Sequence, residues 1–596
     1  MQYKNITQAR FLERPNRFIA KVDIDGRIET VHVKNTGRCK ELLTKGARVY
    51  LEKSDNAERS TAYDLVAVEK GTRLINMDSQ APNRAVGEWL LEKELFPDLV
   101  LVRPETVYGN SRFDFYVETS SEKIFMEVKG VTLEEDGVVR FPDAPSDRAV
   151  KHVEELIQAK RDGYRVFVLF VIQMENARYF TPNYVTHREF GEALRKAAEA
   201  GVEILARDCV VRADSMRINR PVPVKFAEDY ELLSRIPRLL LAWYDENRRI
   251  LPWREESSPY RVWVSEIMLQ QTRVEAVKPF FERFMRELPD IKALAGAEEE
   301  TLLKLWEGLG YYNRVRNLQK AALQIQEEYG GEMPSEYEEL LKLKGIGSYT
   351  AGAVASIAYG RAVPAVDGNV LRVLSRIRRD HRLIGDAKVK AAVERDLREI
   401  MPADRPGDFN QAMMEIGACV CIPNGAPLCE SCPLCVICMA HQAGEEQAYP
   451  RKAAKKPRTV EEKTILVIRD ENRTAIRKRT ERGLLAGMYE LPSMEGFCTA
   501  EEVTAYLVGN GLKPLRIQSL QEAKHIFTHR EWHMKGYMVR VDELEPRETG
   551  ERTADWIYIE PEETKEKYPI PSAFRAYTKY LGMGHGITDV LYQQGL

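Results

Sequence analysis

Two acidic residues stand in stretches where a charge is unexpected, and each could carry out chemistry. Glu266 interrupts the apolar helical pattern VWVSEIML, and Asp367 is the single acid in the run VPAVDGN. A carboxyl group on a mostly buried helix is costly unless it is paired or neutral, so burial should raise the pKa of Glu266 toward the range of a general acid. On these residues alone, Glu266 could equally be a hydrogen-bonded core acid and Asp367 a helix cap.

The stretch 343–370 supplies a setting for Asp367. It holds Gly345 and Gly347, one residue apart, and a helical run of small residues that begins at Ser348. Glycine permits tight turns, and exposed N–H groups at the start of a helix favour phosphate. A turn, a helix and a lone carboxylate suggest a device that grips a nucleic-acid backbone. An ordinary turn followed by a capped helix is the alternative.

Amide and aromatic side chains accompany these acids. Gln270 and Gln271 come one turn after Glu266, and the pair Tyr311-Tyr312 follows two glycines in the segment GLGYY. Amides suit base edges or a wedge into a duplex, and aromatic rings can stack on bases or intercalate. The tyrosines could equally be ordinary core residues.

Six of the nine cysteines lie between positions 419 and 438. Cys421, Cys429, Cys432 and Cys438 have the spacing C-x7-C-x2-C-x5-C, which is too crowded for a scattered disulfide framework. This set has one C-x2-C pair and a short loop, which favours a four-iron four-sulfur cluster over a zinc site. Cys419 and Cys435 are left over, and Cys435 could take the place of Cys438.

A third group of charged residues lies near the start of the chain. Asp114 falls in the strand pattern RFDFYVET (112–119), and Glu127 and Lys129 share a face of the next strand pattern, KIFMEVKG (123–130). Two carboxylates can hold a divalent cation while a lysine steadies a hydroxide or phosphate, as in restriction-type nuclease cores. Surface ion pairs are the plainer reading of such a triple.

The elements that must position these residues change in type along the chain. Up to about residue 225, a hairpin signal at Asp25-Gly26 and strand patterns at 47–53 and 61–70 predict a small β-barrel. Helices at 83–96, 147–162 and 188–200, with strands at 164–174 and 202–211, then predict an α/β unit around the hairpin. From Tyr230 onward the pattern is helical and amphipathic, so we place a boundary near 226.

The composition limits the broad class of protein. The 596 residues suggest two to four domains, and 44% hydrophobic with 30% charged residues suits soluble globular domains. With a net charge of −3, a nucleic-acid partner must be held by local basic patches. No apolar run reaches a membrane span and no secretory signal is evident, so we expect a cytoplasmic protein without a membrane partner.

The first 225 residues resemble the SfsA family, the sugar fermentation stimulation proteins. The resemblance covers about 10–224 and rests on KNTGRCKELL (34–43), YGNSRFDF (108–115), EVKGVTL (127–133), FPDAPSDRAVKHVEEL (141–156) and AGVEIL (200–205). It implies an OB-like barrel on a nuclease-like α/β domain, with DNA binding. By this resemblance Asp114, Glu127 and Lys129 match the nuclease-like positions, Glu88 is an accessory acid, and Mg²⁺ or Mn²⁺ is a candidate cofactor.

About 230–580 resembles the MutY-type adenine DNA glycosylases of the helix-hairpin-helix superfamily. The carrying motifs are YRVWVSEIMLQQT, GLGYYNRVRNL, LKGIGSYTAGAV, VPAVDGNVLRV, FNQAMMEIGA and the four cysteines, whose first spacing is seven residues where that family more often has six. The resemblance implies removal of adenine mispaired with 8-oxoguanine or guanine in double-stranded DNA. Glu266 would protonate adenine N7 and Asp367 would stabilise the sugar cation.

The same resemblance assigns supporting residues. Tyr349 and Asn369 support the site, Arg254 and Glu415 match the adenine pocket, Gln271 and Tyr312 match residues inserted near the lesion, and Gly345 and Gly347 form the backbone-gripping hairpin. In the related endonuclease III branch a lysine stands at the position of Tyr349 and forms a Schiff base. The tyrosine therefore predicts a monofunctional glycosylase.

The last part of the chain resembles a Nudix-fold domain without the Nudix catalytic signature. The stretch RGLLAGMYELP (482–492) carries the Nudix resemblance, and the REx2E core expected after it is absent. HIFTHREWHMKGY (525–537) resembles the MutY loop that recognises 8-oxoguanine, with Phe527, Thr528 and His529 at its tip. The basic stretch YPRKAAKKPR (449–458) reads as a linker, with or without phosphate contacts.

We therefore predict a multidomain fusion that acts as a monomer. Its domains are an OB-like β-barrel (1–80), a restriction-nuclease-like α/β domain (81–225), an all-α helix-hairpin-helix glycosylase with an iron–sulfur cluster (226–441), a linker (442–460) and a Nudix-like α+β domain (461–596). Two alternatives stay open: a non-catalytic DNA-binding or regulatory protein, and a metal-dependent nuclease in the first half.

Overall fold

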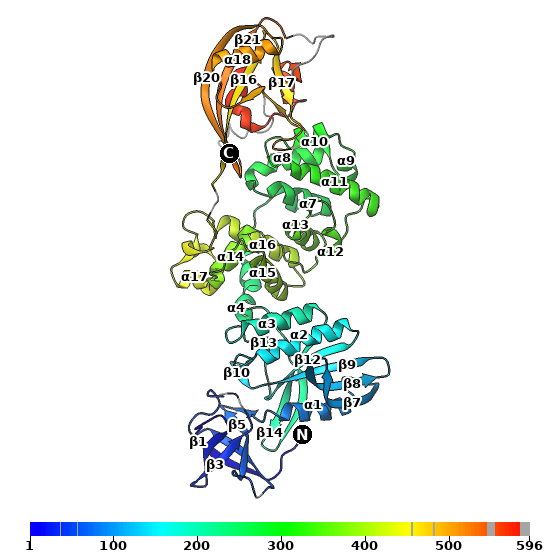
Figure 1. Ribbon diagram of the computed structural model, residues 1–596, viewed down its shortest axis with the longest axis vertical. Helices are drawn as coiled ribbons and strands as arrows, with labels where there is room; N and C mark the ends of the chain where they lie inside the picture. Colours follow the sequence, from blue (N-terminus) through cyan, green and yellow to red (C-terminus); the bar gives the residue numbers. More distant parts are fainter. Residues whose placement is uncertain are drawn as a thin grey trace. The chain divides into compact units, whose positions relative to one another are not determined.

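The computed structural model divides the chain into two compact units, Met1–Tyr230 and Glu231–Leu596 (Figure 1). It describes residues 1–35, 37, 39–56, 58–454, 457–480, 483–544 and 555–583. Parts of the motif 34–43, of the linker 442–460, of the stretch 482–492 and of the domain 461–596 lie outside the described residues. In the described part, no helix is both long and apolar enough to cross a membrane.

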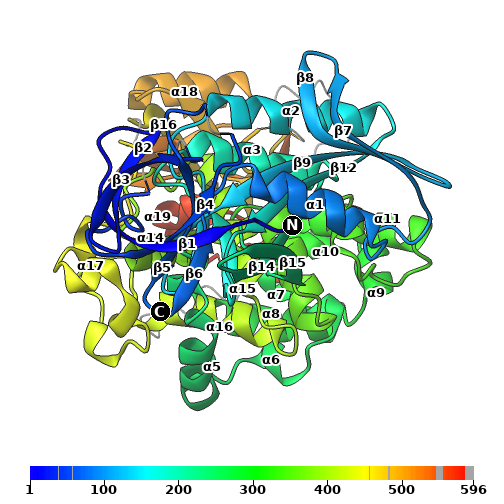
Figure 2. The ribbon, with the colours of Figure 1, turned by 90° about the horizontal axis from the view of Figure 1, so that it is seen from below.

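The first unit begins with an OB-like barrel, as the sequence predicts. Its strands follow the order β3-β2-β1-β4-β5-β6, and a parallel pairing of β3 with β5 closes the sheet on itself (Figure 2). The predicted hairpin joins β2 to β3, and both turn residues have positive φ, 49° at Asp25 and 83° at Gly26. The strands are β1 Ile6–Glu13, β2 Ile19–Ile24, β3 Arg27–Val33, β4 Arg48–Lys53, β5 Tyr63–Lys70 and β6 Arg73–Asn76.

A six-stranded mixed sheet forms the α/β part, in the order β15-β14-β12-β9-β8-β7. β8 and β9 are the predicted antiparallel hairpin, and β12 runs parallel to both β9 and β14. The sequence did not indicate the small second sheet of β10 Leu133–Glu135, β11 Val138–Phe141 and β13 Tyr179–Pro182. The six strands are β7 Leu99–Tyr108, β8 Ser111–Thr119, β9 Lys123–Val131, β12 Arg165–Ile172, β14 Glu203–Arg212 and β15 Ser215–Pro221.

Helices cover both faces of this sheet (Figure 1). α2 (Asp147–Arg161) and α3 (Arg188–Glu199) pack on one face and α1 (Ala81–Leu91) on the other, because alternate side chains of the apolar strand β12 point to opposite faces. α2 begins where predicted, since Ser146 caps its first turn. α1 ends five residues earlier than predicted (96 − 91), and Lys93, at φ 61°, turns the chain out of the helix.

The second unit opens with an all-helical domain, and an aromatic-rich core formed mainly by residues between Leu251 and Ala355 packs its first part. Trp263 and Trp306 are fully buried there, and α7 lies at the centre with eight buried residues. The helices after α4 (Tyr230–Leu233) are α5 Ile236–Asn247, α6 Pro252–Glu255, α7 Pro259–Leu269, α8 Val274–Glu287, α9 Ile291–Ala295, α10 Glu299–Leu305, α11 Asn313–Glu328, α12 Tyr337–Leu340, α13 Ser348–Ala353, α14 Gly368–Arg378, α15 Ala387–Ile400, α16 Pro406–Cys419 and α17 Met439–Gln442.

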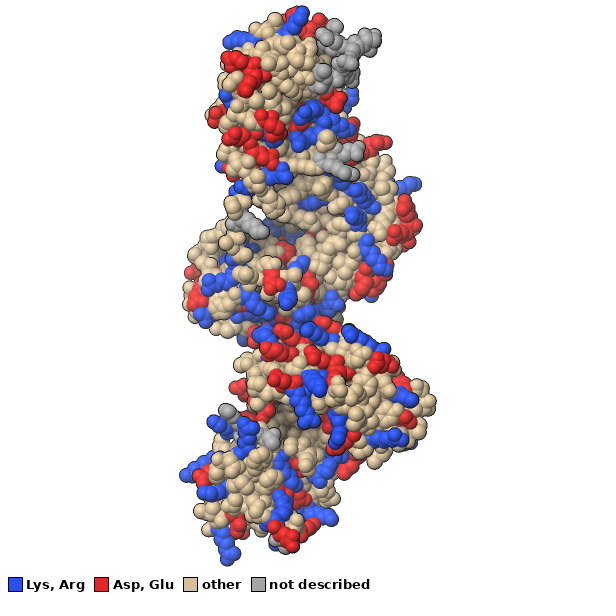
Figure 3. All heavy atoms as spheres, viewed as in Figure 1, with Lys and Arg blue, Asp and Glu red and all other residues tan. Residues whose placement is uncertain are grey.

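A seven-stranded sheet with helix α18 (Ala500–Gly509) forms the C-terminal α+β domain. The central strand β16 runs parallel to β21, which pairs with β20 in a long hairpin. On the face drawn in Figure 3, lysine and arginine side chains are interspersed with acidic side chains, in keeping with nearly equal numbers of the two, 88 and 91. The strands are β16 Thr459–Arg469, β17 Thr474–Lys478, β18 Tyr489–Glu490, β19 Ser493–Glu495, β20 Pro514–Ile526, β21 Arg530–Val541 and β22 Trp556–Ile559.

Candidate active site

Glu266 is a buried acid held ready to carry a proton. Its side chain projects from α7, and the residue is 5% exposed. The Tyr349 hydroxyl, from α13, donates to Glu266 Oε2 at 2.5 Å. Burial is the largest effect and raises the pKa of Glu266 to about 7; the Tyr349 hydrogen bond lowers this pKa in part, the charge of Asp367 raises it further, and Arg254 has the smallest, lowering effect. A carboxyl group with this pKa is partly protonated at neutral pH and can act as a general acid.

Asp367 caps α14 and stays in a setting suited to a negative charge. Its Oδ1 accepts from the backbone N–H groups of Asn369 and Val370, both at 2.8 Å, and its Oδ2 accepts from Asn369 Nδ2 at 2.7 Å. The N-terminus of α14 also favours a carboxylate there. Asp367 is therefore a cap, and it is also the acid whose charge acts on Glu266.

Three packing features place Asp367 beside Glu266. Asn410 of α16 accepts from Ala365 N at 3.0 Å and donates to Val363 O at 2.9 Å, which fixes the segment before Asp367. A side chain at Gly352 of α13 would lie 2.3 Å from the Pro364 carbonyl oxygen, so only glycine allows this approach. After α13 the chain continues as one π-helical turn, Val354–Ala358. The small residues in this run therefore bring the two acids together.

A cavity of about 510 Å³ contains both acids together with Tyr349 and Asn369. Its far wall holds Glu415, which is almost fully buried on α16. Arg249 donates to both Glu415 oxygens, at 2.6 and 3.1 Å, and Arg254 donates to Oε2 at 2.9 Å. Burial would raise the pKa of Glu415, but the two guanidinium groups outweigh burial and hold it below its usual range. The predicted residues Arg254 and Glu415 thus line the same cavity as the two acids.

Arg249 is a functional candidate that the sequence reading missed. It lies five residues before Arg254 in RRILPWRE, and its backbone N–H also donates to Glu415. A buried acid such as Glu415 needs more than one cationic partner to stay charged. The doubled arginine around LPW was the signal that could have identified it.

The two tyrosines of GLGYY, which the sequence offers together as a stacking or inserted pair, differ in exposure. Tyr312, the one matched to an inserted residue, is 6% exposed and its hydroxyl accepts from Gly308 N at 3.4 Å, so its ring packs in the core. Tyr311 is 49% exposed and has φ 49°, a strained backbone conformation that turns its ring outward. Gln271 is exposed and also has positive φ, 59°.

The predicted loop Phe527–His529 joins β20 to β21. Phe527 packs its ring against Trp532 and His525, while Thr528 and His529 are exposed. The hydroxyl groups of Thr528 and Tyr311 form a hydrogen bond of 2.7 Å. The loop and the exposed tyrosine therefore meet, although they are 217 residues apart in the sequence.

The predicted hairpin glycines lie between α12 and α13. Gly345 has φ 79°, and a side chain there would lie 2.7 Å from Asn317 of α11. Gly347 caps α13 from an extended conformation. Both glycines therefore fit a tight turn that leads into the helix carrying Tyr349.

The four predicted cysteine ligands gather in the loop after α16. Burial, and further the charges of Cys421 and Cys438, raise the pKa of Cys432 to about 12, and Arg376 donates to Cys421 Sγ at 3.1 Å. In the described part of the chain, one grouping of three ligand atoms lies within 4.8 Å, and it joins Cys429 to His441 and Glu446. Four cysteines in one loop supply the thiolate donors that a four-iron four-sulfur cluster uses.

The predicted acids of the first unit also meet. Asp114 Oδ2 accepts from Val128 N and its Oδ1 from Asn83 Nδ2, both at 2.7 Å, and burial and then Glu127 raise the pKa of Asp114. Lys129 donates to Glu127 Oε1 at 2.6 Å, and a hydrogen bond of 2.5 Å joins the same oxygen to His152 Nδ1.

The second carboxylate oxygen of Glu127, Oε2, takes no part in these hydrogen bonds. It is buried, and it has no hydrogen-bond partner among the described residues. Burial would raise the pKa of Glu127, but His152 and Lys129 bring it below its usual range. A charged carboxylate with an unused oxygen next to Asp114 suits a divalent cation.

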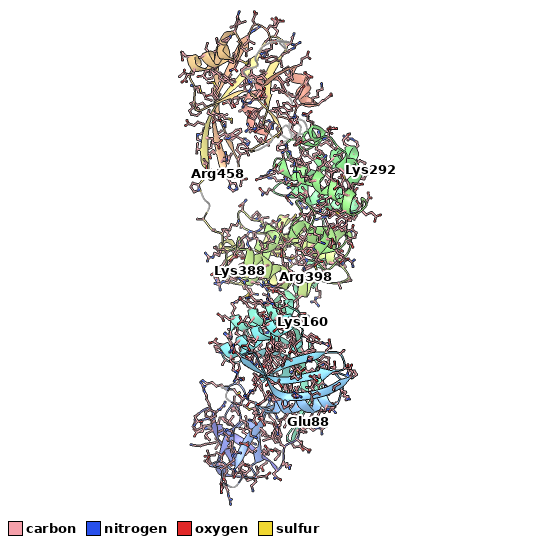
Figure 4. All side chains as sticks on the ribbon, turned by 45° about the vertical axis from the view of Figure 1, so that its right-hand side comes forward. Glu88, Lys160, Lys292, Lys388, Arg398 and Arg458 are labelled. Atoms are coloured by element: carbon pink, nitrogen blue, oxygen red, sulfur yellow. The ribbon has the colours of Figure 1, made fainter. Side chains whose placement is uncertain are left out.

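Glu88 does not join the acids of the first unit. It lies on α1 (Figure 4), with a side chain that is 59% exposed and paired with the Met1 ammonium group at 2.6 Å. Asn83 and His152, which the sequence reading did not select, contact the acids instead. Asn83 lies five residues before Glu88 on α1, so this helix does contribute a side chain to the group around Asp114.

Four family models match the chain. They are the SfsA N-terminal OB domain at 12–77, the sugar fermentation stimulation protein RE domain at 80–215, the HhH-GPD superfamily base excision DNA repair protein at 264–402, and a NUDIX domain at 464–580. The predicted fusion and fold class are thereby confirmed, and the helical domain is a DNA repair glycosylase domain of this superfamily.

Curated relatives and solved structures resemble parts of the chain. Sugar fermentation stimulation protein homologs from Ruminiclostridium cellulolyticum and Clostridium beijerinckii are 56% and 55% identical over 225 and 224 residues, which is 38% of this chain and 100% and 99% of theirs. SfsA of Pyrococcus furiosus in complex with Ca²⁺ is 31% identical, with a TM-score of 0.35, over 38% of this chain and 98% of its own. A trapped endonuclease III–DNA covalent intermediate is 26% identical, with a TM-score of 0.31, over 36% and 98%. The chain belongs to the sugar fermentation stimulation protein family, and it joins that family's two domains to a base excision repair domain and a NUDIX domain.

Proposed function

We propose that the helical domain hydrolyses the glycosidic bond of adenine mispaired with 8-oxoguanine or guanine in double-stranded DNA. The observation that carries the proposal is the pairing of a buried acid, Glu266, whose pKa is raised to about 7, with the capped carboxylate Asp367 in one cavity. In glycoside hydrolysis one carboxyl group is neutral and donates a proton, while a second carboxyl group is charged and supports the reaction at the sugar.

Each residue in the cavity takes one task. Glu266, held in orientation by the Tyr349 hydroxyl, gives its proton to adenine N7, which makes the base a better leaving group. Asp367 stabilises the positive charge that develops on the sugar and helps to place the attacking water. Asn369 fixes one oxygen of Asp367, so that carboxylate is oriented before the substrate arrives.

The adenine must leave the base stack to reach this cavity. Both carboxylate oxygens of Glu415 accept hydrogen bonds from Arg249 or Arg254. The main effect of Glu415 is therefore to fix the two guanidinium groups on the cavity wall. Donors held in this way can bind acceptor atoms on the edge of an extruded base. Adenine is our choice because Arg254 and Glu415 match the adenine-pocket positions of the MutY-type glycosylases.

Residues outside the cavity engage the duplex. The turn at Gly345 and Gly347 holds the backbone, and Gln271 enters the helix near the mispair. Tyr311 replaces Tyr312 in the second inserted position, because it is the exposed tyrosine. The loop of Phe527, Thr528 and His529 reads 8-oxoguanine on the opposite strand, which the Thr528–Tyr311 hydrogen bond supports.

The full chain should release free adenine from a duplex with one adenine opposite 8-oxoguanine, and more slowly opposite guanine. Tyr349 offers no amine for a Schiff base, so borohydride should trap no covalent complex with the DNA. Chromatography of the released base and denaturing gels of the trapped sample measure the two properties together. Release of thymine or guanine instead of adenine would contradict the substrate, and efficient trapping would contradict the monofunctional reaction.

The cysteine loop is proposed to hold one four-iron four-sulfur cluster through Cys421, Cys429, Cys432 and Cys438. Such a cluster, when bound, closes the loop after α16 by four iron–sulfur bonds. Arg372, which donates to Cys421 O at 2.9 Å and to Asn369 Oδ1 at 2.9 Å, connects this loop to the start of α14.

Replacing Cys432 with serine should abolish bound iron and inorganic sulfide, because a cubane cluster loses one of its four thiolates. Cys435→Ser is the matched control, three residues away in the same loop, and should keep both. Iron and sulfide assays of the purified variants test this. Loss of iron in Cys435→Ser, or zinc in place of iron in the unaltered protein, would contradict the assignment.

A second activity, metal-dependent cleavage of DNA, is favoured by the first unit. The observation is the unused Glu127 oxygen beside Asp114, with Lys129 on the same strand. The two carboxylates would hold Mg²⁺ or Mn²⁺ and Lys129 would face the phosphate. The alternative is that this unit binds DNA without cutting it.

The cleavage test uses the full chain with Glu266→Gln, so that base release does not create breaks. With Mg²⁺ or Mn²⁺ this protein should nick plasmid DNA, and a further Asp114→Asn change should abolish nicking and weaken Mn²⁺ binding in calorimetry. Asp98→Asn removes an exposed acid of the same domain as a control. Binding of DNA without cleavage in the presence of either Mg²⁺ or Mn²⁺ would show that the first unit only binds DNA.

A further inference from the structure

We propose that Arg314 is a positioning residue that holds, with one guanidinium group, the two turns that present Gln271 and Tyr311 to DNA. The inference rests on the proposed function, and it adds a residue outside the lining of the cavity. Arg314 lies in the first turn of α11, two residues after Tyr312.

The first turn held by Arg314 is the end of α7. Its Nη1 donates to the carbonyl oxygens of Ile267 at 2.8 Å and of Gln270 at 2.5 Å, with a longer bond to Met268 at 3.3 Å. The last carbonyls of a helix have no partner within the helix, and they favour a cation. The next residue, Gln271, has φ 59°, so this turn needs outside support.

The second turn is the glycine-rich loop before α11. Arg314 Nη2 donates to the carbonyl oxygens of Leu309 at 2.9 Å and of Gly310 at 3.1 Å. Its guanidinium carbon lies 5.4 Å from the centre of the Tyr311 ring and 5.5 Å from that of Trp306. Tyr311 at φ 49° and Gly310 at φ 69° are the strained residues here.

Only a planar fork can serve both turns at once. The five bonds leave Arg314 through two nitrogens to two separate segments, 40 residues apart between Gln270 and Gly310 (310 − 270). Lysine presents a single ammonium group and cannot reach both in this geometry. In the described part of the chain Arg314 forms no ion pair, so backbone carbonyl dipoles and the two aromatic rings compensate its charge, and burial lowers its pKa to about 10.

Arg283 supplies a matched control within the same domain. It is a half-buried arginine on α8 that donates to the carbonyl oxygens of Lys304 and Leu305, at 3.1 and 2.9 Å, at the end of α10. Burial lowers its pKa as it does for Arg314, but neither carbonyl belongs to a turn that carries an inserted residue. Removing either guanidinium group should therefore lower stability, with the larger loss for Arg314 because it forms five backbone bonds and Arg283 forms two. Only the loss of Arg314 should disturb the turns that present Gln271 and Tyr311.

The test compares Arg314→Met and Arg283→Met in the full chain, with 2-aminopurine next to an adenine opposite 8-oxoguanine. Arg314→Met should lose most of the fluorescence rise on binding and slow single-turnover adenine release by about ten- to a hundred-fold. Arg283→Met should keep both within about two-fold, although its Tm also falls. If Arg314→Met does not fold, Arg314→Lys replaces it in both measurements, and the same losses of fluorescence rise and of release rate are expected.

The energetic coupling between Arg314 and Tyr311, measured in a double variant, gives the second readout. Because Arg314 acts through Tyr311, adding Tyr311→Ala to Arg314→Met should slow release little further. Equal effects of the two arginine changes, or multiplied effects in the double variant, would overturn the proposal. Failure of the unaltered protein to release adenine would instead overturn the proposed function.

Discussion

Replacing Glu266 with glutamine should slow single-turnover release of adenine by about a hundred- to ten-thousand-fold, the range of general acid catalysis. Glutamine keeps the shape and can still accept from Tyr349, but it has no acidic proton to give. Affinity for the mispaired duplex should change little, because Glu266 is only 5% exposed and most of the duplex is held by residues outside the cavity. Quench-flow or manual time courses with enzyme in excess measure the rate apart from product release.

The matched control is Glu307→Gln. Glu307 is also buried in the helical domain and burial raises its pKa, but it bonds to Lys304 Nζ and Ile570 N, away from the cavity. It should keep the rate within a few-fold. If Glu266→Gln and the unaltered protein release adenine equally slowly, the domain is a lesion sensor that binds without catalysis.

The Glu266→Gln substitution should stabilise the protein, relative to the unaltered chain, at higher pH. The pKa of Glu266 is raised from 4.5 to about 7 in the folded chain, so the folded state binds its proton more tightly than the unfolded state. The resulting stability is present below pH 4.5 and is lost as the pH rises through about 7, a loss on the order of 3 kcal/mol. The Tm advantage of Glu266→Gln should therefore grow between pH 5 and pH 7 and then level off.

Replacing Asp367 with asparagine should slow adenine release by about a hundred- to a thousand-fold, because the sugar cation loses its counter-charge. Asparagine is as good a helix cap as aspartate, so α14 should keep its start. Affinity for DNA should hold or increase, since one negative charge is removed beside the backbone. The same single-turnover assay, with a binding curve, separates the two effects.

A control for the loss of a capping carboxylate is available. Asp386 caps α15 through Lys388 N at 2.8 Å, in the same domain and outside the cavity lining. Asp386→Asn should leave the rate unchanged. Equal losses in the Asp367 and Asp386 variants would mean that Asp367 acts through helix stability, and the catalytic role would be withdrawn.

The sequence predicted most of the fold because each element has its own local signal. The Asp25-Gly26 turn, the apolar alternation of β8 and β9, and the Ser146 cap all act within a few residues. The small sheet of β10, β11 and β13 was missed because its strands are three or four residues long and β13 pairs with β11 from a distant part of the sequence. The end of α1 was misplaced because the left-handed residue there is Lys93, which has no propensity that marks it.

The candidate site was predictable where one residue type is chemically unusual for its surroundings. Glu266 and Asp367 satisfied that condition, and the fold brings them together through Gly352 and Asn410. Adjacent tyrosines look identical in a sequence, so the choice between Tyr311 and Tyr312 depended on a backbone angle that only the structure supplies. Arg249 and His152 were missed because their significance comes from the buried acids they contact.

The central claim is that a protonated Glu266 drives the release of adenine. The most direct test is the single-turnover rate on the adenine:8-oxoguanine duplex between pH 5.5 and 9. Because the pKa of Glu266 is raised to about 7, the rate should be highest on the acidic side and fall about ten-fold per pH unit above that value. The same plot for Glu266→Gln should be low and flat. A rate that stays constant or rises through pH 7 in the unaltered protein would contradict the account.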